Sequence, residues 1–213
     1  MKFIDLFCGI GGFHVALENL GHTCVFASDI DEKCRKVYEN NYSIRPHGDI
    51  SNHIDDVPPH DILCAGFPCQ PFSRAGFQRG FDDDRGNLFF VICKILKKRK
   101  PPYVLLENVR NLASHDDGNT WRVIRQSLLY LGYITYEDPV ILNAMHFGVP
   151  QNRERVIIMA KRHTLGPMPP LPDIPKKPKS ENLKDFLIPG PSNLSVKMKV
   201  VEQVWNEFLS LGL

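Results

Sequence analysis

The chain has 213 residues, 43% of them hydrophobic, and a formal net charge of +2. This length suits one domain and the beginning of a second, and the apolar content suits a globular core. The balanced charge lacks the strong positive excess of many nucleic-acid-binding domains, although it leaves room for a local basic patch.

The sequence contains no sign of a membrane span or of a secretion signal. No apolar run approaches the roughly 18 residues that a span needs, and the N-terminus has no signal-peptide core. The six cysteines form neither a CxxC pair nor a cluster with zinc-ligand spacing. We therefore expect a soluble protein with free thiols, in a reducing compartment, that holds no metal.

Short apolar runs alternate with helical patterns from the first residue. The predicted strands cover residues 3–7, 24–28, 61–65, 103–106 and 156–159, and three predicted helices cover 13–20, 88–100 and 121–131. A further helix, with Cys34, Val37 and Tyr38 on one face, is predicted after the second strand. Gly21 and Pro101-Pro102 end two of these helices. Repeated βα units predict a doubly wound, mostly parallel α/β sheet of the Rossmann-like type, covered on both faces.

The composition changes after about residue 163. Residues 166–178 contain six prolines, which is typical of a linker or a surface loop, and a last helical pattern runs from about Val196 to Leu209. We expect a cofactor-binding catalytic domain over residues 1–163 and a linker with a connector over residues 164–213.

A glycine-rich turn, Asp5 to Gly12, separates the first strand from the first helix. Glycines there let a ligand approach the backbone, and a helix N-terminus favours a carboxylate or phosphate. Asp29 ends the second strand, where an acid suits a ribose diol, and Asp49 follows a presumed third strand. His14 stands where the dinucleotide fingerprint needs its third glycine, so a tight turn without a ligand remains an alternative.

Cys69 lies in a loop after the third predicted strand, between two prolines, in the run GFPCQPFS. Strand carboxyl ends are where α/β sheets place their chemistry, and the prolines would present the thiol outward. A free thiol has a pKa near about 8.5, so a nucleophile there needs help from dipoles or cations. The alternative is an inert cysteine, an interpretation that we keep for the other five.

Two further motifs point to the same edge of the sheet. Glu107, in ENV, comes at the end of a predicted strand. In QNRER, a strand-like register would place Gln151, Arg153 and Arg155 on one face, where a guanidinium could hold a carbonyl or a phosphate. Taken singly, each motif is also compatible with a surface ion pair.

Together these motifs resemble the cytosine-5 DNA methyltransferases. In chain order the matches are DLFCGIGGFH at Asp5–His14, ASDID at Ala27–Asp31, GDI at Gly48–Ile50, GFPCQPFS at Gly66–Ser73, RGNLFF at Arg85–Phe90, ENV at Glu107–Val109 and QNRERV at Gln151–Val156. Their order is that of the family, and they cover residues 2 to about 162.

The resemblance implies a fold, a reaction and a set of roles. The fold is that of a class I S-adenosylmethionine-dependent methyltransferase. Cys69 would attack C6 of a cytosine flipped out of double-stranded DNA, with Glu107 at N3 and Arg155 at the O2 side. Arg153 and Gln151 would support the site, and Gln70 and Ser73 would close on the DNA. The implied contacts to S-adenosylmethionine are Phe7, Gly9, Gly11, Asp29, Ile30, Asp49, Ile50, Pro68 and Leu88.

Residues 165–213 contain neither the target-recognition region nor the last two motifs that family members normally have. We therefore expect a truncated chain, a fragment or one subunit of a split enzyme, with weak cofactor affinity and little turnover alone. A second subunit or a C-terminal half would read the target. The resemblance also implies a cytoplasmic bacterial or phage protein of a restriction-modification system, associated with the nucleoid through DNA.

Three other functions remain open at this point. A tRNA cytosine-5 methyltransferase of the same family shares most of the motifs. A nicotinamide oxidoreductase would explain the glycine turn and Asp29. A non-catalytic module that kept the fold would bind the cofactor without trapping DNA. The basic run Lys97–Lys100 could touch DNA, but cations at a helix C-terminus are also favoured by the helix dipole.

Overall fold

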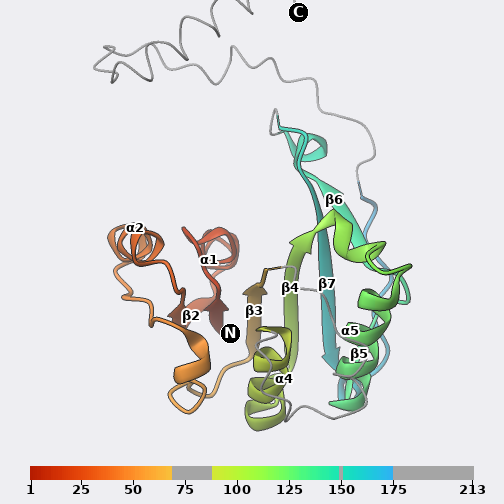
Figure 1. The fold of residues 1–213 in the computed structure, drawn as a ribbon, viewed down its shortest axis with the longest axis horizontal. Coiled ribbons are helices and arrows are strands. Elements are labelled where there is room, and N and C mark those ends of the chain that lie inside the picture. Colours follow the sequence, from red (N-terminus) through yellow and green to blue (C-terminus); the bar gives the residue numbers. More distant parts are fainter. Residues whose placement is uncertain (69–87, 149–150, 175–213) are drawn as a thin grey trace, which may run out of the picture. The chain divides into compact units, whose positions relative to one another are not determined.

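A single mixed sheet organises the part of the chain that the computed structural model describes, residues 1–68, 88–148 and 151–174 (Figure 1). The strands are β1 (Lys2–Leu6), β2 (Thr23–Ser28), β3 (Ile62–Gly66), β4 (Tyr103–Val109), β5 (Tyr133–Thr135), β6 (Val140–Asn143) and β7 (Glu154–Arg162). The helices are α1 (Gly12–Glu18), α2 (Glu32–Tyr42), α4 (Leu88–Arg99) and α5 (Asn119–Tyr130). Short 3-10 turns η1 (Ile50–Asn52), η2 (Arg110–Ala113), η3 (Ala144–Phe147) and η4 (His163–Leu165) connect them.

The strand order is β2-β1-β3-β4-β7-β5, and β6 also pairs with β7. Strands β2, β1, β3 and β4 run parallel to one another, whereas β4, β5 and β6 each pair antiparallel with β7. The predicted doubly wound α/β class is confirmed, with its parallel half at β1–β4 and its antiparallel half around β7. The carboxyl ends of β1–β4 form one edge of the sheet, which we call the carboxyl edge.

The two faces of the sheet carry separate cores because side chains alternate along each strand. Ile4, Leu6 and Leu63 face a large core that includes the apolar sides of α4 and α5. Phe3, Ile62 and other residues of the opposite face pack in a smaller core with Leu17 of α1 and Tyr38 of α2. Covering both faces is what the near-continuous apolar β1 and β3 require.

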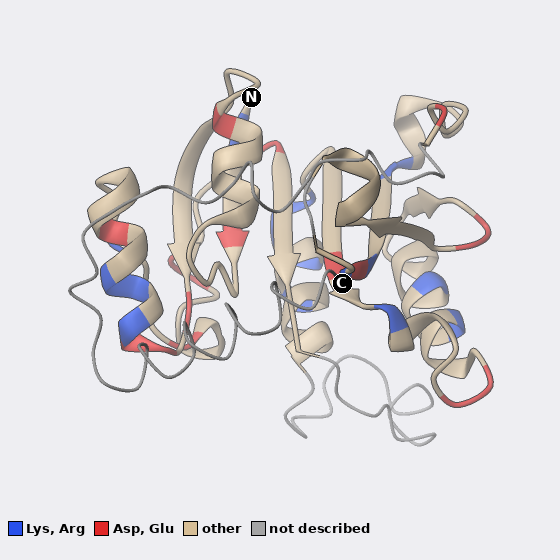
Figure 2. Ribbon diagram, turned by 90° about the horizontal axis from the view of Figure 1, so that it is seen from above, with Lys and Arg blue, Asp and Glu red and all other residues tan. Residues whose placement is uncertain are grey.

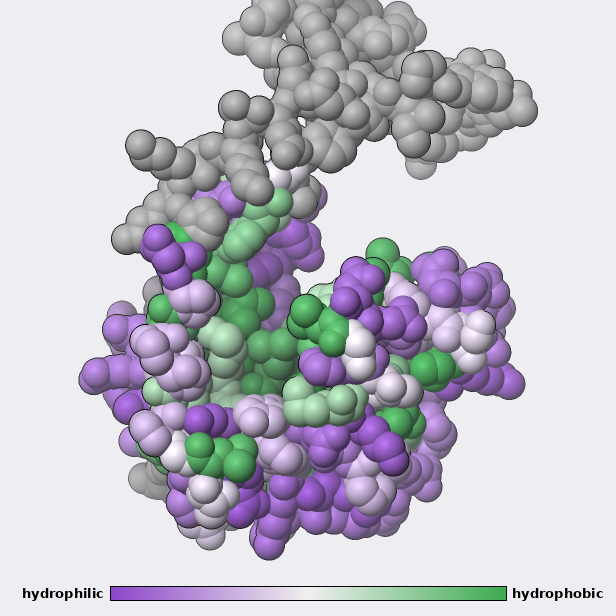
Figure 3. All heavy atoms as spheres, turned by 180° about the vertical axis from the view of Figure 1, so that it is seen from behind, coloured by the Kyte–Doolittle hydropathy of each residue, from purple (hydrophilic) through white to green (hydrophobic). Residues whose placement is uncertain are grey.

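Part of the second face is an apolar hollow. Ile62, Leu105 and Met159 of three neighbouring strands line it, together with Leu17 of α1 and with Met168 farther along the chain. Figure 3 shows this side of the molecule, with hydrophobic residues at the bottom of the hollow.

Three local features differ from the sequence prediction. Strands β5 and β6 were not expected. A strand before Asp49 was expected, but the structure has only a single bridge there, between Ser28 and His47, because Pro46 has no N–H for a ladder.

Among the described residues, no helix is both long and apolar enough to cross a membrane.

Candidate functional site

The carboxyl edge brings together several of the described residues that the sequence motifs single out. Asp29 follows β2, Pro68 follows β3, and Glu107 lies near the end of β4, opposite Gly66. A Cβ built on Gly66 would lie 3.5 Å from Oε2 of Glu107 and 3.8 Å from the carbonyl oxygen of Phe7. Three segments far apart in the sequence therefore meet within one or two side-chain lengths.

The glycine loop, residues 7–12, has an unusual backbone. Phe7, Gly9 and Gly11 have φ values of 54°, 53° and 97°, in the left-handed region that costs energy for side chains with a Cβ. One side of the loop is fixed to β2, because Cys8 N donates to the Ser28 carbonyl at 3.0 Å and Gly9 N to Asp29 Oδ2 at 2.8 Å. Asp29 Oδ1 accepts from Asp31 N at 2.8 Å, so this carboxylate is held by backbone on both oxygens.

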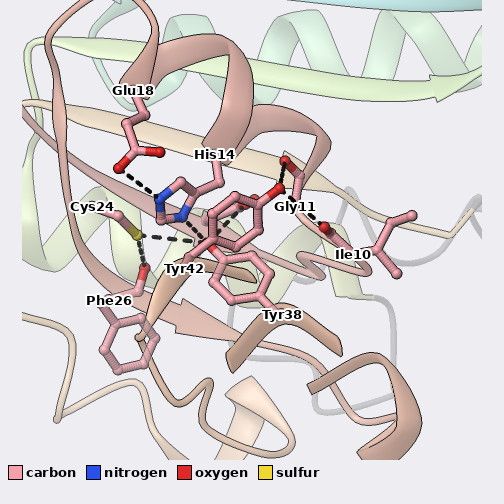
Figure 4. A network of polar contacts seen from close by, with 9 residues as sticks. Ile10, Gly11, His14, Glu18, Cys24, Phe26, Tyr38 and Tyr42 are labelled. Carbon is pink, nitrogen blue, oxygen red and sulfur yellow. Dashed lines mark hydrogen bonds and ion pairs between the residues drawn. The ribbon is translucent and has the colours of Figure 1, made fainter. Parts of the chain in front are cut away.

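The other side of the loop is fixed to α2 by Tyr42, which the sequence motifs did not single out. Its hydroxyl donates to the carbonyls of Ile10 and Gly11 at 3.3 and 3.2 Å. The ring stacks on His14, with centroids 3.9 Å apart and planes 16° apart (Figure 4). In the sequence, only the spacing of Tyr38 and Tyr42, four residues apart and so on one helix face, could have indicated this contact.

A buried polar network continues beneath this contact. The Tyr38 hydroxyl lies 2.6 Å from His14 Nδ1 (Figure 4). It also donates to Asp5 Oδ2 at 3.3 Å. Burial raises the pKa of the Asp5 carboxyl to about 8, although hydrogen bonds from Tyr38 and from the backbone of His14 oppose the change. Burial also lowers the pKa of His14, which favours the neutral ring. The raised pKa favours the protonated form of Asp5 in the folded chain near neutral pH.

The remaining cofactor candidates differ in what they can offer a ligand. Ile30 is a large apolar side chain with 76% exposure next to Asp29. Asp49 caps the N-terminus of η1 and accepts from Ser51 N at 2.9 Å. Ile50 is 2% exposed and part of the core, so it could present little beyond its backbone. Pro68 is exposed, and Leu88, the first residue of α4, is half-buried.

Glu107 and Arg155 form an ion pair at the carboxyl edge, with Arg155 Nε 2.8 Å from Glu107 Oε1. Both side chains are partly exposed, at 30% and 24%. Arg155 also donates from Nη1 to the carbonyl of Glu154 at 2.8 Å. The pair therefore combines a carboxylate with a fixed guanidinium, both within reach of solvent, which suits recognition of a polar planar ligand.

Asn108 links this strand to the chain segment that leads toward Cys69. Its Nδ2 donates to the carbonyl of Phe67 at 2.8 Å, and its Oδ1 accepts from Val109 N at 2.8 Å. Asn108 is 2% exposed. A buried amide thus fixes the backbone two residues before Cys69. Cys69, Gln70 and Ser73 themselves lie outside the described residues.

The expectation that Gln151, Arg153 and Arg155 share one strand face is wrong, because β7 begins only at Glu154. The cause is Asn143, whose Oδ1 accepts from Arg153 N at 3.1 Å and from Met145 N at 3.2 Å. This contact ties the backbone of residue 153 to the end of β6, just before the first residue of β7. Gln151 and Arg153 are exposed in front of the strand.

The five described cysteines have the setting of inert thiols. Cys8, Cys24, Cys64 and Cys93 are buried, and Cys34 is half-buried. Burial raises the pKa of each thiol, to about 11 for Cys24. These thiols stay protonated at neutral pH and are poor nucleophiles.

One cluster of described side chains has the composition of a metal site, but local contacts account for it. His47, His53 and Asp56 each place a possible metal ligand within 4.8 Å of the others, but His53 is hydrogen-bonded to Asp56 and His47 stacks on Phe26. These contacts explain the arrangement without an ion. That the chain holds no metal stays a prediction.

The basic run lies on the far side of the sheet from the carboxyl edge, because it leads into the first residues of β4. Lys98 pairs with the Asp55 carboxylate, and Arg99 donates to the Asp55 carbonyl at 2.9 Å. Figure 2 shows basic residues on α2, α4 and α5, where they decorate the outer helices. These contacts favour a structural role for the run over a contact with DNA.

Known proteins are similar to this chain in sequence and in fold. Residues 1–207 match the family model described as C-5 cytosine-specific DNA methylase. Type II methyltransferase M.HhaI of Haemophilus parahaemolyticus is 42% identical over 200 residues, which are 93% of this chain and 56% of that protein. M.NgoBI of Neisseria gonorrhoeae is 52% identical over 160 residues, 74% of this chain and 50% of that protein. The chain thus spans about half the length of these curated relatives.

Solved structures share this fold. The S. pombe Dnmt2 methyltransferase has a TM-score of 0.68 at 24% identity, over 90% of this chain and 62% of that chain, which supports the fold alone. A DNMT2 variant of Spodoptera frugiperda has a TM-score of 0.60 at 27% identity, over 84% of this chain and 53% of that chain. The chain belongs to the C-5 cytosine-specific DNA methylase family.

Proposed function

We propose that the protein is part of a DNA (cytosine-5-)-methyltransferase that transfers a methyl group from S-adenosylmethionine to C5 of a flipped cytosine. The observation that carries the proposal is the Glu107–Arg155 pair, 2.8 Å apart, beside Gly66 and near the start of the Pro-Cys-Gln loop. A carboxylate and a guanidinium on one edge match the polar groups of a cytosine ring. M.HhaI and M.NgoBI are both type II methyltransferases, which favours DNA over tRNA as the substrate.

The geometry of the glycine loop and its neighbours fits S-adenosylmethionine. The two oxygens of Asp29 each accept one backbone N–H, and a carboxylate has about four acceptor sites, which leaves capacity for a ribose diol. The exposed Ile30 side chain offers an apolar contact for an adenine ring, and Asp49 offers an acceptor for its amino group. We further assign Phe7, Gly9, Gly11, Ile50, Pro68 and Leu88 to this site.

The proposed chemistry divides between Cys69 and the Glu107–Arg155 pair. The thiolate of Cys69 adds to C6, and the electron pair of the C5–C6 double bond moves to C5. A proton taken up from water and shared between the Glu107 carboxyl group and N3 neutralises the charge of that adduct. Glu107 also accepts from the amino group of the base, while Arg155 holds both Glu107 and the O2 side. S-adenosylmethionine supplies the methyl group when bound. Loss of the C5 proton to water then expels the Cys69 thiolate.

We assign DNA contacts to Gln70, Ser73 and Gln151. Arg153, whose backbone N–H donates to Asn143, would support the pocket. Residues 1–163 would be the catalytic domain, and residues 164–213 would lead toward a part that reads the target sequence. In the relatives, about half of the length lies outside the matched region. We propose that the target-reading part corresponds to that unmatched half or is carried by a second subunit.

The cofactor assignment is tested by calorimetry on the 213-residue chain. We expect S-adenosylhomocysteine to bind with micromolar to millimolar affinity and NAD not to bind. Asp29→Asn should weaken binding about tenfold, because an amide replaces one acceptor with a donor. Asp31→Asn is the matched control, since Asp31 lies two residues away and caps α2 through Lys33 N at 2.8 Å.

Binding of NAD without S-adenosylhomocysteine would instead identify a nicotinamide enzyme and refute the proposal. Equal affinities of the Asp29→Asn and Asp31→Asn chains would remove Asp29 from the site. Cofactor binding without any DNA adduct, even with a complementing half, would indicate a non-catalytic module.

A further inference from the structure

Tyr42 holds the tip of the glycine loop from outside the loop. We infer that Tyr42 is a positioning residue, which keeps the loop in the conformation that binds the cofactor. The inference rests on the proposed function, because it names a residue that acts on the same cofactor site. Tyr42 lies at the end of α2, and none of the family motifs quoted above includes it.

The Tyr42 hydroxyl and the Tyr42 ring each make a specific contact with the loop. The hydroxyl lies 3.3 Å from the Ile10 carbonyl and 3.2 Å from that of Gly11, so one donor is shared between successive peptide groups. A Cβ built on Gly11 would lie 2.2 Å from Cε2 of the ring. The ring therefore occupies the space that any other residue at position 11 would need.

Neighbouring rings hold the Tyr42 ring in place. His14 stacks on one side at 3.9 Å, and Tyr38 meets it edge-on at 4.8 Å (Figure 4). His14 and Tyr38 are 2% and 0% exposed, and each is tied to the other by a 2.6 Å hydrogen bond. A donor mounted on so constrained a ring can fix the carbonyls it contacts, whereas a freely rotating side chain could not.

The opposite side of the loop is fixed by Asp29, the proposed ribose ligand, through Gly9 N. Between these two anchors the backbone passes through the left-handed region at Gly9 and Gly11. Release of the Tyr42 anchor would let residues 10 and 11 change conformation, and Gly9 with them. The effect would reach Asp29 through their 2.8 Å bond, which links a residue of α2 to cofactor affinity.

The test compares Tyr42→Phe with Tyr136→Phe in the 213-residue chain. Both variants lose a tyrosine hydroxyl that donates to a backbone carbonyl, since Tyr136 donates to Pro169 at 2.8 Å, outside the loop. The phenylalanine keeps the ring of Tyr42 and its stacking. We measure the dissociation constant of S-adenosylhomocysteine by calorimetry, the melting temperature, and the amide NMR shifts of Gly9 and Gly11.

We expect Tyr42→Phe to weaken binding about two- to tenfold, the loss that follows from one net hydrogen bond, and to shift both glycine amides. Tyr136→Phe should lower the melting temperature similarly and leave the affinity unchanged. Equal affinities of the two variants, with unmoved glycine amides, would show that Tyr42 contributes to stability alone and overturn the inference. A parent chain that binds no S-adenosylhomocysteine would instead overturn the proposed function and the inference together.

Discussion

The substitution Asp5→Asn should change how the stability of the chain depends on pH. The Asp5 carboxyl is fully buried beneath the glycine loop, and among the described residues its Oδ1 has no hydrogen-bond partner. Burial raises its pKa from 3.8 to about 8. Between these values the folded chain holds a proton that the unfolded chain has lost, so folding becomes less favourable as pH rises through this window.

The size of the effect follows from the width of that window. Each pH unit inside it costs about 1.4 kcal/mol of unfolding free energy, so the parent chain should lose roughly 2–3 kcal/mol between pH 6 and pH 8. Asp5→Asn removes this titration while its amide oxygen can still accept from Tyr38. The free-energy difference between parent and variant should therefore fall with pH and level off above about pH 8.

Urea unfolding at half-unit steps from pH 5.5 to pH 9 measures this difference. The histidines with lowered pKa, such as His14, act in the opposite direction at acid pH, but they are common to both chains and cancel in the difference. Asp31→Asn, at the exposed cap of α2, serves as the control and should show no such slope. Parallel curves for the parent and Asp5→Asn chains would refute the assignment of a buried, protonated Asp5.

Two further substitutions test the backbone geometry of the site. Gly11→Ala should lower the free energy of unfolding in urea by about 1–3 kcal/mol, because φ is 97° and the new Cβ would overlap the Tyr42 ring. Gly12→Ala is the control and should be neutral, because a Cβ there has nothing within 4 Å. Equal stability of the two variants would contradict this packing. Asn108→Ala should cost about 1–3 kcal/mol by leaving the Phe67 carbonyl unpaired, with the exposed Asn111→Ala as control. A thermal melt of Asn108→Ala that matches the control would show that this hydrogen bond does not matter.

The sequence predicted the elements that have strong local patterns. The buried runs of β1, β3 and β4 and the apolar faces of α4 and α5 are continuous enough to be recognised one at a time. The position of Glu107 at the carboxyl edge followed from the rule for parallel strands. Strands β5 and β6 have three and four residues, too few for a period, and they form only because β7 pairs with them.

The contacts between distant residues could not be predicted in this way. The Glu107–Arg155 pair depends on the register of β4 against β7, where Val109 lies opposite Arg155. The position of Arg153 before β7 depends on a hydrogen bond to one amide, that of Asn143. The contact of Tyr42 with the glycine loop depends on how α2 packs beside α1, which no motif encodes.

Covalent trapping tests the central claim, that Cys69 attacks cytosine, most directly. The chain is mixed with S-adenosylmethionine and duplex DNA that contains 5-fluorocytosine, whose fluorine blocks the final elimination, with and without the carboxy-terminal half of a related type II methyltransferase. We predict a denaturation-resistant adduct when that half is present, lost in Cys69→Ser and kept in Cys64→Ser, whose thiol is buried in β3. No adduct under either condition, or an adduct that survives Cys69→Ser, would contradict the proposed mechanism.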